Sequence, residues 1–274
     1  MSTRMHSFLY VPATRPDRFS KAVDTGAHAV IVDLEDAVNA DDKDRARAHL
    51  AAQAGALKAA CDARGTQLLV RINARTTPWH DEDVRLCATL GLHGIVVPKP
   101  DCAQALGILA DALPGKDLYL LVETLRGFSR IDTIAAAPAV RCMMFGTVDL
   151  MLDMGITDAD VPLHHFRSLI LMHSRLAGLE LPVDGVCTAL DDGEALQGEI
   201  RRAQRFGFGA KLCVHPSQVG PINALFAPSA EDLAWARRVV DGAAHAGGAA
   251  IKVDGQLVDA PVLEQARQLL ARAR

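Results

Sequence analysis

Eight short runs of aliphatic and β-branched residues, each followed by a polar cluster and a helical pattern, constrain the fold of this 274-residue chain most strongly. Successive runs are roughly 29 residues apart, and a strand–helix barrel of ~250 residues needs about 31 residues per unit. The runs are continuous rather than alternating, which is typical of parallel strands buried on both faces. They are Phe8–Val11, Ala29–Val32, Leu68–Ile72, Gly94–Val97, Leu118–Val122, Cys142–Phe145, Leu181–Val186 and Leu212–Val214.

This rhythm predicts an α/β protein, a (β/α)8 TIM barrel that occupies residues 1–228. Residues 229–274 follow a different pattern. A helix begins at Ser229, a Gly/Ala-rich break covers 246–250, Asp254 and Gly255 form a tight turn, and a last helix closes the chain. We expect this segment to be a C-terminal helical extension, either a lid or a subunit-exchanged arm, with a structural cap as the alternative.

Composition excludes several classes of function. The net charge of −4 argues against a chain that coats nucleic acid, and the 4% aromatic content offers few platforms for single strands. No apolar run reaches the ~18 residues of a membrane span, and the sequence shows no signal peptide. The six cysteines have no CxxC spacing, which favours buried, reduced thiols in a cytoplasmic protein.

Polar residues follow each run, at the positions where the active site of a TIM barrel lies. Because the runs end in acids and bases with almost no apolar residue among them, one rim is expected to be a catalytic face. These residues include Pro12, Thr14, Arg15, Asp33, Glu35, Asp36, Arg71, Asn73, Lys99, Glu123, Thr124, Gly146, Thr147, Asp149, Asp184, His215 and Gln218.

Glu123 and Asp149 are the best candidates for metal ligands. They follow adjacent predicted strands, so their carboxylates can converge. Ligation by two carboxylates with open positions suits Mg²⁺, which keeps waters and takes substrate oxygens. The alternative is that each carboxylate pairs with an Arg or a Lys.

Arg71 alternates with apolar neighbours in VRIN, which predicts that its guanidinium points into the barrel mouth. A buried arginine needs an anionic partner, which is Glu35, Asp36 or a bound carboxylate. A structural ion pair and direct substrate contact both remain open. Arg15 and Lys21 could meet a phosphate-bearing ligand or lie solvated on the surface.

In order and spacing, several segments resemble one family. The chain is similar to the citrate lyase β-subunit-like branch of the HpcH/HpaI aldolase/citrate lyase family, from about Ser7 to Pro228 and into the tail. The segments are FLYVPATRPDRFSKA, VIVDLEDAV with Lys43 and Arg47 downstream, VRIN, PK, ET, FGTVDL and GAKLCVHPSQ.

The resemblance implies a TIM barrel that uses Mg²⁺ to make or break a carbon–carbon bond beside an acyl thioester. It implies that Glu123 and Asp149 bind the metal and that Arg71 binds substrate. Glu35 and Asp36 match the residues that hold this arginine or a metal-bound water.

Two further roles come from the resemblance. The backbone N–H groups of Gly146, Thr147 and Val148 match a loop that cradles the substrate carboxylate. The tail carries the G-x-x-x-D-x-P pattern of malyl-CoA and citramalyl-CoA lyases, in which an extension closes over a neighbouring subunit. Asp259 fits the position of its proton-transferring acid, and a homotrimer or hexamer is expected.

The resemblance therefore implies a Mg²⁺-dependent lyase that cleaves or forms a 3-hydroxyacyl-CoA thioester, such as malyl-, citramalyl- or citryl-CoA, to acetyl-CoA and a 2-ketoacid. Three alternatives stay open: a thioester hydrolase, a β subunit acting on a carrier-bound citryl group, and a CoA-independent pyruvate aldolase. The pyruvate aldolases have a histidine soon after the second strand, where this chain has DLEDAV. The sequence leaves the acyl group undetermined.

Overall fold

The computed structural model describes residues 5–244 and 250–272, and it divides into two compact units. One unit covers Met5–Asn223 and the other contains the chain from Ala224 onward. The division lies five residues before the expected boundary at 228, inside the helix α10 (Val219–Phe226). Most of the expected break at 246–250 lies outside the described residues. Each unit is considered by itself.

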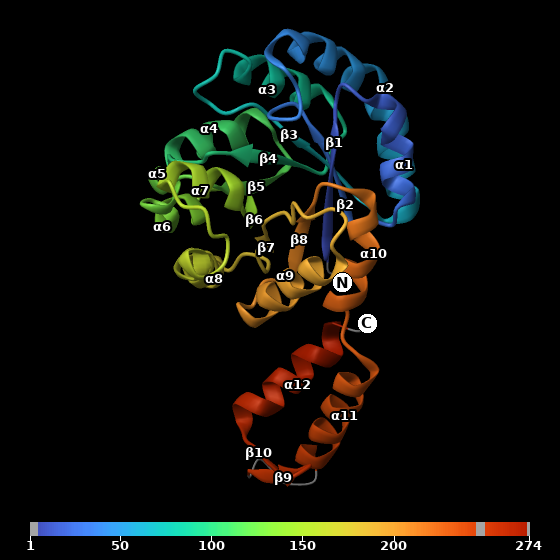
Figure 1. Ribbon diagram of the computed structural model, residues 1–274, viewed down its shortest axis with the longest axis vertical. Coiled ribbons are helices and arrows are strands. Elements are labelled where there is room, and N and C mark those ends of the chain that lie inside the picture. Colours follow the sequence, from blue (N-terminus) through green and yellow to red (C-terminus); the bar gives the residue numbers. More distant parts are fainter. Residues whose placement is uncertain (1–4, 245–249, 273–274) are drawn as a thin grey trace. The chain divides into compact units, whose positions relative to one another are not determined.

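The larger unit is a closed barrel of eight parallel strands, in the order β1 to β8, with β8 pairing back on β1. Every expected run contributes one strand, so the predicted TIM barrel is confirmed (Figure 1). The strands are β1 (Ser7–Pro12), β2 (Ala29–Asp33), β3 (Gln67–Arg71), β4 (Gly94–Pro98), β5 (Asp117–Val122), β6 (Val140–Phe145), β7 (Val183–Asp184) and β8 (Ala210–Cys213).

Helices connect successive strands and surround the barrel (Figure 1). The α-helices are α1 (Phe19–Asp24), α2 (Lys43–Arg64), α3 (His80–Thr89), α4 (Ala103–Ala112), α5 (Leu125–Phe128), α6 (Ile131–Ala135), α7 (Thr147–Met154), α8 (His164–Leu176), α9 (Gly193–Arg205) and α10. The 3-10 turns are η1 (Pro16–Arg18), η2 (Ala40–Asp42), η3 (Val161–Leu163) and η4 (Pro216–Gln218).

The side-chain alternation of the strands explains how the barrel presents charges at its mouth. Inward-facing residues form one buried cluster: Phe8, Ala29, Ile31, Leu69, Val96, Tyr119, Leu121, Cys142, Met144, Val183, Ala210 and Leu212. Because side chains alternate with a period of two, the residue two positions after an inward-facing one shares its face. Asp33 follows Ile31 in this way, and Arg71 follows Leu69.

Strand β7 is shorter than the sequence suggests, with two residues in place of the expected run Leu181–Val186. Pro182 lacks an N–H and so cannot donate to a neighbouring strand. Its carbonyl still accepts a hydrogen bond from Gly209 N at 3.0 Å, which keeps the chain alongside β8.

The C-terminal unit is a helical hairpin closed by a small sheet (Figure 1). It contains α11 (Ala230–Ala244), the antiparallel strands β9 (Ile251–Val253) and β10 (Gln256–Val258), and α12 (Ala260–Arg272). Asp254 and Gly255 turn the chain with φ of 49° and 84°, so the predicted tight turn is confirmed. Four buried residues form its core: Ala236, Val239, Val258 and Ala266.

Two further expectations concern the whole described chain. All six cysteines lie within it and carry free thiols, five of them buried. Across residues 5–244 and 250–272, none of the helices combines the length and hydropathy that a bilayer crossing requires.

Candidate active site

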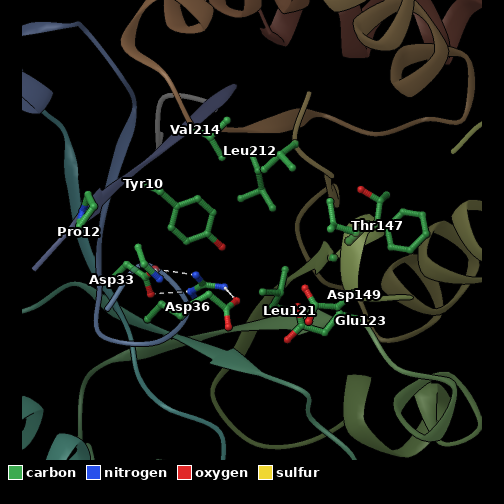
Figure 2. A pocket seen from close by; sticks show the side chains of 16 residues that line it. Tyr10, Pro12, Asp33, Asp36, Leu121, Glu123, Thr147, Asp149, Leu212 and Val214 are labelled. Atoms are coloured by element: carbon green, nitrogen blue, oxygen red, sulfur yellow. Dashed lines mark hydrogen bonds and ion pairs between the residues drawn. The ribbon is translucent and has the colours of Figure 1, made fainter. Parts of the chain in front are cut away.

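A cavity of about 410 Å³ opens at the carboxyl ends of the barrel strands. Figure 2 shows Asp33 and Asp36 on one side of it and Glu123 and Asp149 on the other. The lining residues come from the ends of seven strands or the loops that follow them: Tyr10, Pro12, Asp33, Asp36, Ala37, Arg71, Leu121, Glu123, Phe145, Gly146, Thr147, Val148, Asp149, Val186, Leu212 and Val214. The expected catalytic face thus surrounds one cavity whose floor is apolar.

Arg71 is buried in the cavity wall, and its principal partner is Asp33. Its Nε and Nη2 donate to the two carboxylate oxygens of Asp33 at 2.7 and 2.6 Å. Burial alone would raise the pKa of Asp33, but the charge and hydrogen bonds of Arg71 lower it below its usual value. Asp33 therefore fixes Arg71 as a bidentate pair.

The two expected partners of Arg71 make weaker contacts. Its Nη1 lies 3.0 Å from Asp36 Oδ2 and 3.2 Å from Glu35 Oε2. Both expected partners therefore form ion pairs with Arg71, but the prediction missed the bidentate partner Asp33, which occupies the inward face of β2 while the other two acids stand on the loop beyond it. Arg71 donates three hydrogen bonds, two to Asp33 and one to Asp36, which leaves one hydrogen on each of Nη1 and Nη2 for a ligand.

Glu123 is 1% exposed, directly after β5. Burial raises its pKa to about 8, against the opposing charge of Lys99. Gly146 leaves room for this side chain because it has no Cβ. A Cβ at position 146 would lie 2.3 Å from the Cβ of Glu123. A glycine is therefore required beside the carboxylate.

Lys99 stands among three carboxylates at the mouth. Its Nζ lies 3.0 Å from Glu35 Oε1 and 3.5 Å from both Glu123 Oε1 and Asp149 Oδ1. Burial would lower the pKa of Lys99, but the carboxylates, Glu123 foremost, raise it above its ordinary value. Glu123 and Asp149 therefore both form an ion pair with a lysine in this structure, as the alternative to metal binding predicted.

The same carboxylates fit a magnesium ion. Glu123 and Asp149 both line the cavity, and oxygens of both approach one cationic nitrogen, so a cation can contact both. The described residues contain no cluster of three or more His, Cys, Asp or Glu side chains that forms a complete cage. Two carboxylates with room for water and substrate oxygens suit Mg²⁺, which keeps part of its hydration shell.

The loop expected to cradle a carboxylate lies in the wall, with one correction. Gly146 N donates to Val122 O at 3.0 Å, so this N–H is engaged in the barrel and cannot bind substrate. Thr147 and Val148 are the first residues of α7, and helix-starting N–H groups have no partner within the helix. The role predicted for Gly146 is thereby excluded, and the role of Thr147 and Val148 in binding an anion stays a prediction.

The remaining sequence candidates lie in different places. Pro12 lines the cavity, but Arg15 and Lys21 do not. Arg15 is exposed and pairs with Asp17 at 2.8 Å, and Lys21 is exposed on α1. Asp259 belongs to the C-terminal unit, where it is exposed and its Oδ1 accepts from Val262 N at 3.2 Å, at the start of α12. The roles predicted for these residues remain predictions.

Sequence reasoning gave no role to a buried lysine that supports the acidic loop. Lys43 Nζ donates to Leu34 O, Glu35 O and Asn73 Oδ1, each at 2.7 Å. Asn73 in turn donates its Nδ2 to Asp83 at 2.6 Å. This network fixes the backbone on which Glu35 stands, and only the segment around Lys43 in the family resemblance pointed to it.

Tyr10 is a second residue that sequence reasoning missed. It lines the cavity, and the centre of its ring lies 4.7 Å from the guanidinium carbon of Arg71. The sequence could have predicted that Tyr10 faces the cavity, because it lies two residues after the inward-facing Phe8 on the same strand.

Comparison with known proteins gives a consistent result. A model of the HpcH/HpaI aldolase/citrate lyase family matches residues 6–216. A citrate lyase subunit beta-like protein of Mycobacterium tuberculosis is 37% identical, covering 97% of this chain and 94% of the relative. A (3S)-malyl-CoA thioesterase of Cereibacter sphaeroides is 33% identical, covering 100% of this chain and 97% of the relative.

A solved structure resembles the whole chain. The protein CitE of Mycobacterium tuberculosis, crystallised with magnesium, acetoacetate and coenzyme A, superposes with a TM-score of 0.85 at 34% sequence identity. The match covers 100% of this chain and 99% of that one.

Proposed function

The chain belongs to the HpcH/HpaI aldolase/citrate lyase family, and from this premise we propose that it is a Mg²⁺-dependent carbon–carbon lyase acting on a 3-hydroxyacyl thioester of coenzyme A. One observation carries the proposal. A single cavity brings together two carboxylates suited to a hard cation and a bidentately held arginine suited to an oxyanion. The products would be acetyl-CoA and a 2-ketoacid.

Glu123 and Asp149 would hold the magnesium ion, in keeping with the magnesium found in the similar CitE structure. When bound, Mg²⁺ supplies Lewis acidity at the hydroxyl and carboxylate oxygens of the substrate. Thr147 and Val148 would donate their N–H groups to the substrate carboxylate at the start of α7. These contacts would orient the bond that breaks.

Arg71 would stabilise the charge that develops during cleavage. As the carbon–carbon bond breaks, its electron pair moves into the thioester and forms an enolate, while the hydroxyl gives its proton to a water held by Glu35 or Asp36 and becomes the carbonyl of the 2-ketoacid. An N–H of Arg71 that the acids leave unused is suited to the enolate oxygen, an effect worth several kcal/mol in a water-excluded site. Glu35 and Asp36 would hold this arginine or a nearby water.

Asp259 would complete the reaction by giving a proton to the enolate carbon, and would remove it in the reverse direction. This proposal rests on the resemblance of the tail to acyl-CoA lyases, in which a neighbouring subunit supplies the acid. It implies a homotrimer or hexamer whose arms exclude water from the reaction.

The substrate is expected to be a malyl-, citramalyl- or citryl-type thioester. Arg15 and Lys21 would contact coenzyme A phosphates, since both are exposed basic residues on the segment that follows β1, and Pro12 would pack against the acyl portion.

Thioester hydrolysis is a second candidate, favoured by the whole-length similarity to a (3S)-malyl-CoA thioesterase. In that reaction water attacks the thioester carbonyl and the carbon–carbon bond stays intact. The same metal and arginine contacts would bind the same substrate class, so the two reactions differ in their products.

A panel of 3-hydroxyacyl-CoA thioesters with Mg²⁺ separates these reactions. Ketoacid is measured by hydrazone formation and free thiol by a thiol-reactive dye, in parallel samples. We expect ketoacid without thiol. Thiol without ketoacid would identify a hydrolase, and neither product across the panel would contradict both candidates. A citryl group on a carrier protein and free 4-hydroxy-2-ketoacids complete the panel, to test the carrier-dependent and aldolase alternatives.

A further inference from the structure

Lys99 has an unusual backbone for its residue type. Its φ is 48°, in the left-handed region that favours glycine. Only three described residues other than glycine have a positive φ, and Lys99 is the one that contacts the candidate metal ligands. Strained backbone of this kind persists where the surroundings hold it, often at functional sites.

The surroundings that hold Lys99 are the acids of the mouth. Its own N–H donates to Glu123 Oε1 at 3.1 Å, while its Nζ approaches the same oxygen at 3.5 Å. Glu35 and Asp149 follow β2 and β6, so one ammonium group joins carboxylates from three strand ends. Among the described residues, no other basic side chain lies within 4.0 Å of the carboxylate of Glu123 or Asp149.

Resting on the proposed role of Glu123 and Asp149 as metal ligands, we propose that Lys99 is an internal counter-ion that competes with the divalent cation for these carboxylates. Two cations that approach the same oxygens repel each other strongly where water is scarce. Glu35 offers Lys99 the shortest contact, 3.0 Å, and lies outside the proposed ligand pair. Lys99 therefore withdraws toward Glu35 when the cation binds.

This role has a consequence opposite to that of a purely structural ion pair. A structural lysine that organises the carboxylates would strengthen metal binding, so its removal would weaken it. A competing ammonium lowers metal affinity, so its removal strengthens it. The direction of the change therefore separates the two roles without a measurement of catalysis.

The test uses Mn²⁺ as the probe, in the absence of any thioester, with free Mn²⁺ followed by electron paramagnetic resonance. The variants are Lys99→Met, which keeps most of the side-chain volume, and Lys99→Gly, which suits the left-handed backbone and preserves the fold. Lys58→Met is the matched control, since Lys58 pairs with Asp62 within α2. We expect both Lys99 variants to bind Mn²⁺ about tenfold or more tightly than wild type, and Lys58→Met to bind as wild type does.

Unchanged or weaker Mn²⁺ binding in both Lys99 variants would overturn the proposal. Tighter binding in Lys99→Gly alone would also overturn it, because relief of backbone strain would then be the cause. Glu123→Gln distinguishes this failure from failure of the metal site. If wild type does not bind Mn²⁺, or if Glu123→Gln binds it as tightly as wild type does, the proposed metal role of Glu123 fails and this inference fails with it. If wild type binds Mn²⁺ and the Lys99 variants match it, only the inference fails.

Discussion

The barrel mouth and the C-terminal unit hold their charged residues in different ways. At the mouth, Asp33, Arg71 and Glu123 are at most 8% exposed, and rigid strands position them. In the C-terminal unit, Asp259 is exposed, and its carboxylate accepts a hydrogen bond from the start of its own helix. Substitutions at the mouth should therefore change stability and chemistry together, whereas those in the C-terminal unit can separate the two.

The largest effect is expected for Arg71→Met. It leaves the buried carboxylate of Asp33 without its cation, which costs about 3–5 kcal/mol of unfolding free energy, while Glu35 keeps its ion pair with Lys99. Cleavage should also fall by at least about 100-fold because the oxyanion contact is lost. Urea unfolding and steady-state kinetics measure both effects.

Arg238→Met is the control from the C-terminal unit, because Arg238 pairs with Asp254 and both side chains are about half exposed. It should cost less than about 1 kcal/mol. If Arg71→Met and Arg238→Met lose the same unfolding free energy, the barrel mouth and the C-terminal unit do not differ in the way proposed.

The next effect is expected for Asp259→Asn. Asparagine begins a helix as well as aspartate does, so the melting temperature should stay near that of wild type. The proton transfer should be lost, lowering kcat by about 10²–10⁴-fold with thioester binding retained. Calorimetric titration with a substrate analogue and a rate assay measure the two quantities.

Asp254→Asn provides a control in the same unit, at the turn between β9 and β10. It should leave kcat unchanged. If Asp259→Asn also retains full activity, the C-terminal unit contributes no acid to the reaction.

Glu123→Gln should lower Mg²⁺ affinity by about 100-fold, because a neutral amide replaces one of two carboxylate ligands. The substitution keeps the side chain's volume beside Gly146, so far-ultraviolet circular dichroism should be unchanged. Competition between Mg²⁺ and Mn²⁺ measures the affinity. A folded variant with wild-type metal affinity would remove Glu123 from the metal site.

The smallest effect is a pH dependence in Asp33→Asn. The pKa of Asp33 is lower in the folded chain than its ordinary value of 3.8. Its stabilising pairing with Arg71 is therefore present above about pH 4 and is lost as the pH falls through the folded pKa. Wild type should exceed the variant by about 1–3 kcal/mol at pH 7, with a difference that shrinks toward pH 3. If the difference in unfolding free energy between wild type and Asp33→Asn stays constant from pH 7 to pH 3, the ionised Asp33 carboxylate is not the source of the stabilisation.

Much of the barrel could be predicted because buried parallel strands produce continuous apolar runs. The polar residue after a run also located Glu123 and Asp149 correctly at the cavity. Strand β7 was predicted too long, since apolar character around Pro182 does not ensure a ladder of hydrogen bonds.

The details of the site needed three-dimensional information. The segment DLED offers three acids to Arg71, and only the alternation along β2 selects Asp33 as the bidentate partner. No local pattern predicts the left-handed backbone of Lys99, because lysine does not favour it. Gly146 was predicted as a donor to substrate, yet its N–H belongs to the hydrogen bonds between β5 and the start of α7.

Gly146 also limits which substitutions the barrel can accept at two positions. A Cβ at 146 would lie 2.3 Å from the Cβ of Glu123 and 2.6 Å from one of its carboxylate oxygens. Every residue except glycine has a Cβ, so a shorter side chain at 123 does not relieve this clash. On this backbone positions 123 and 146 cannot both carry side chains, and the acid at 123 is compatible only with glycine at 146.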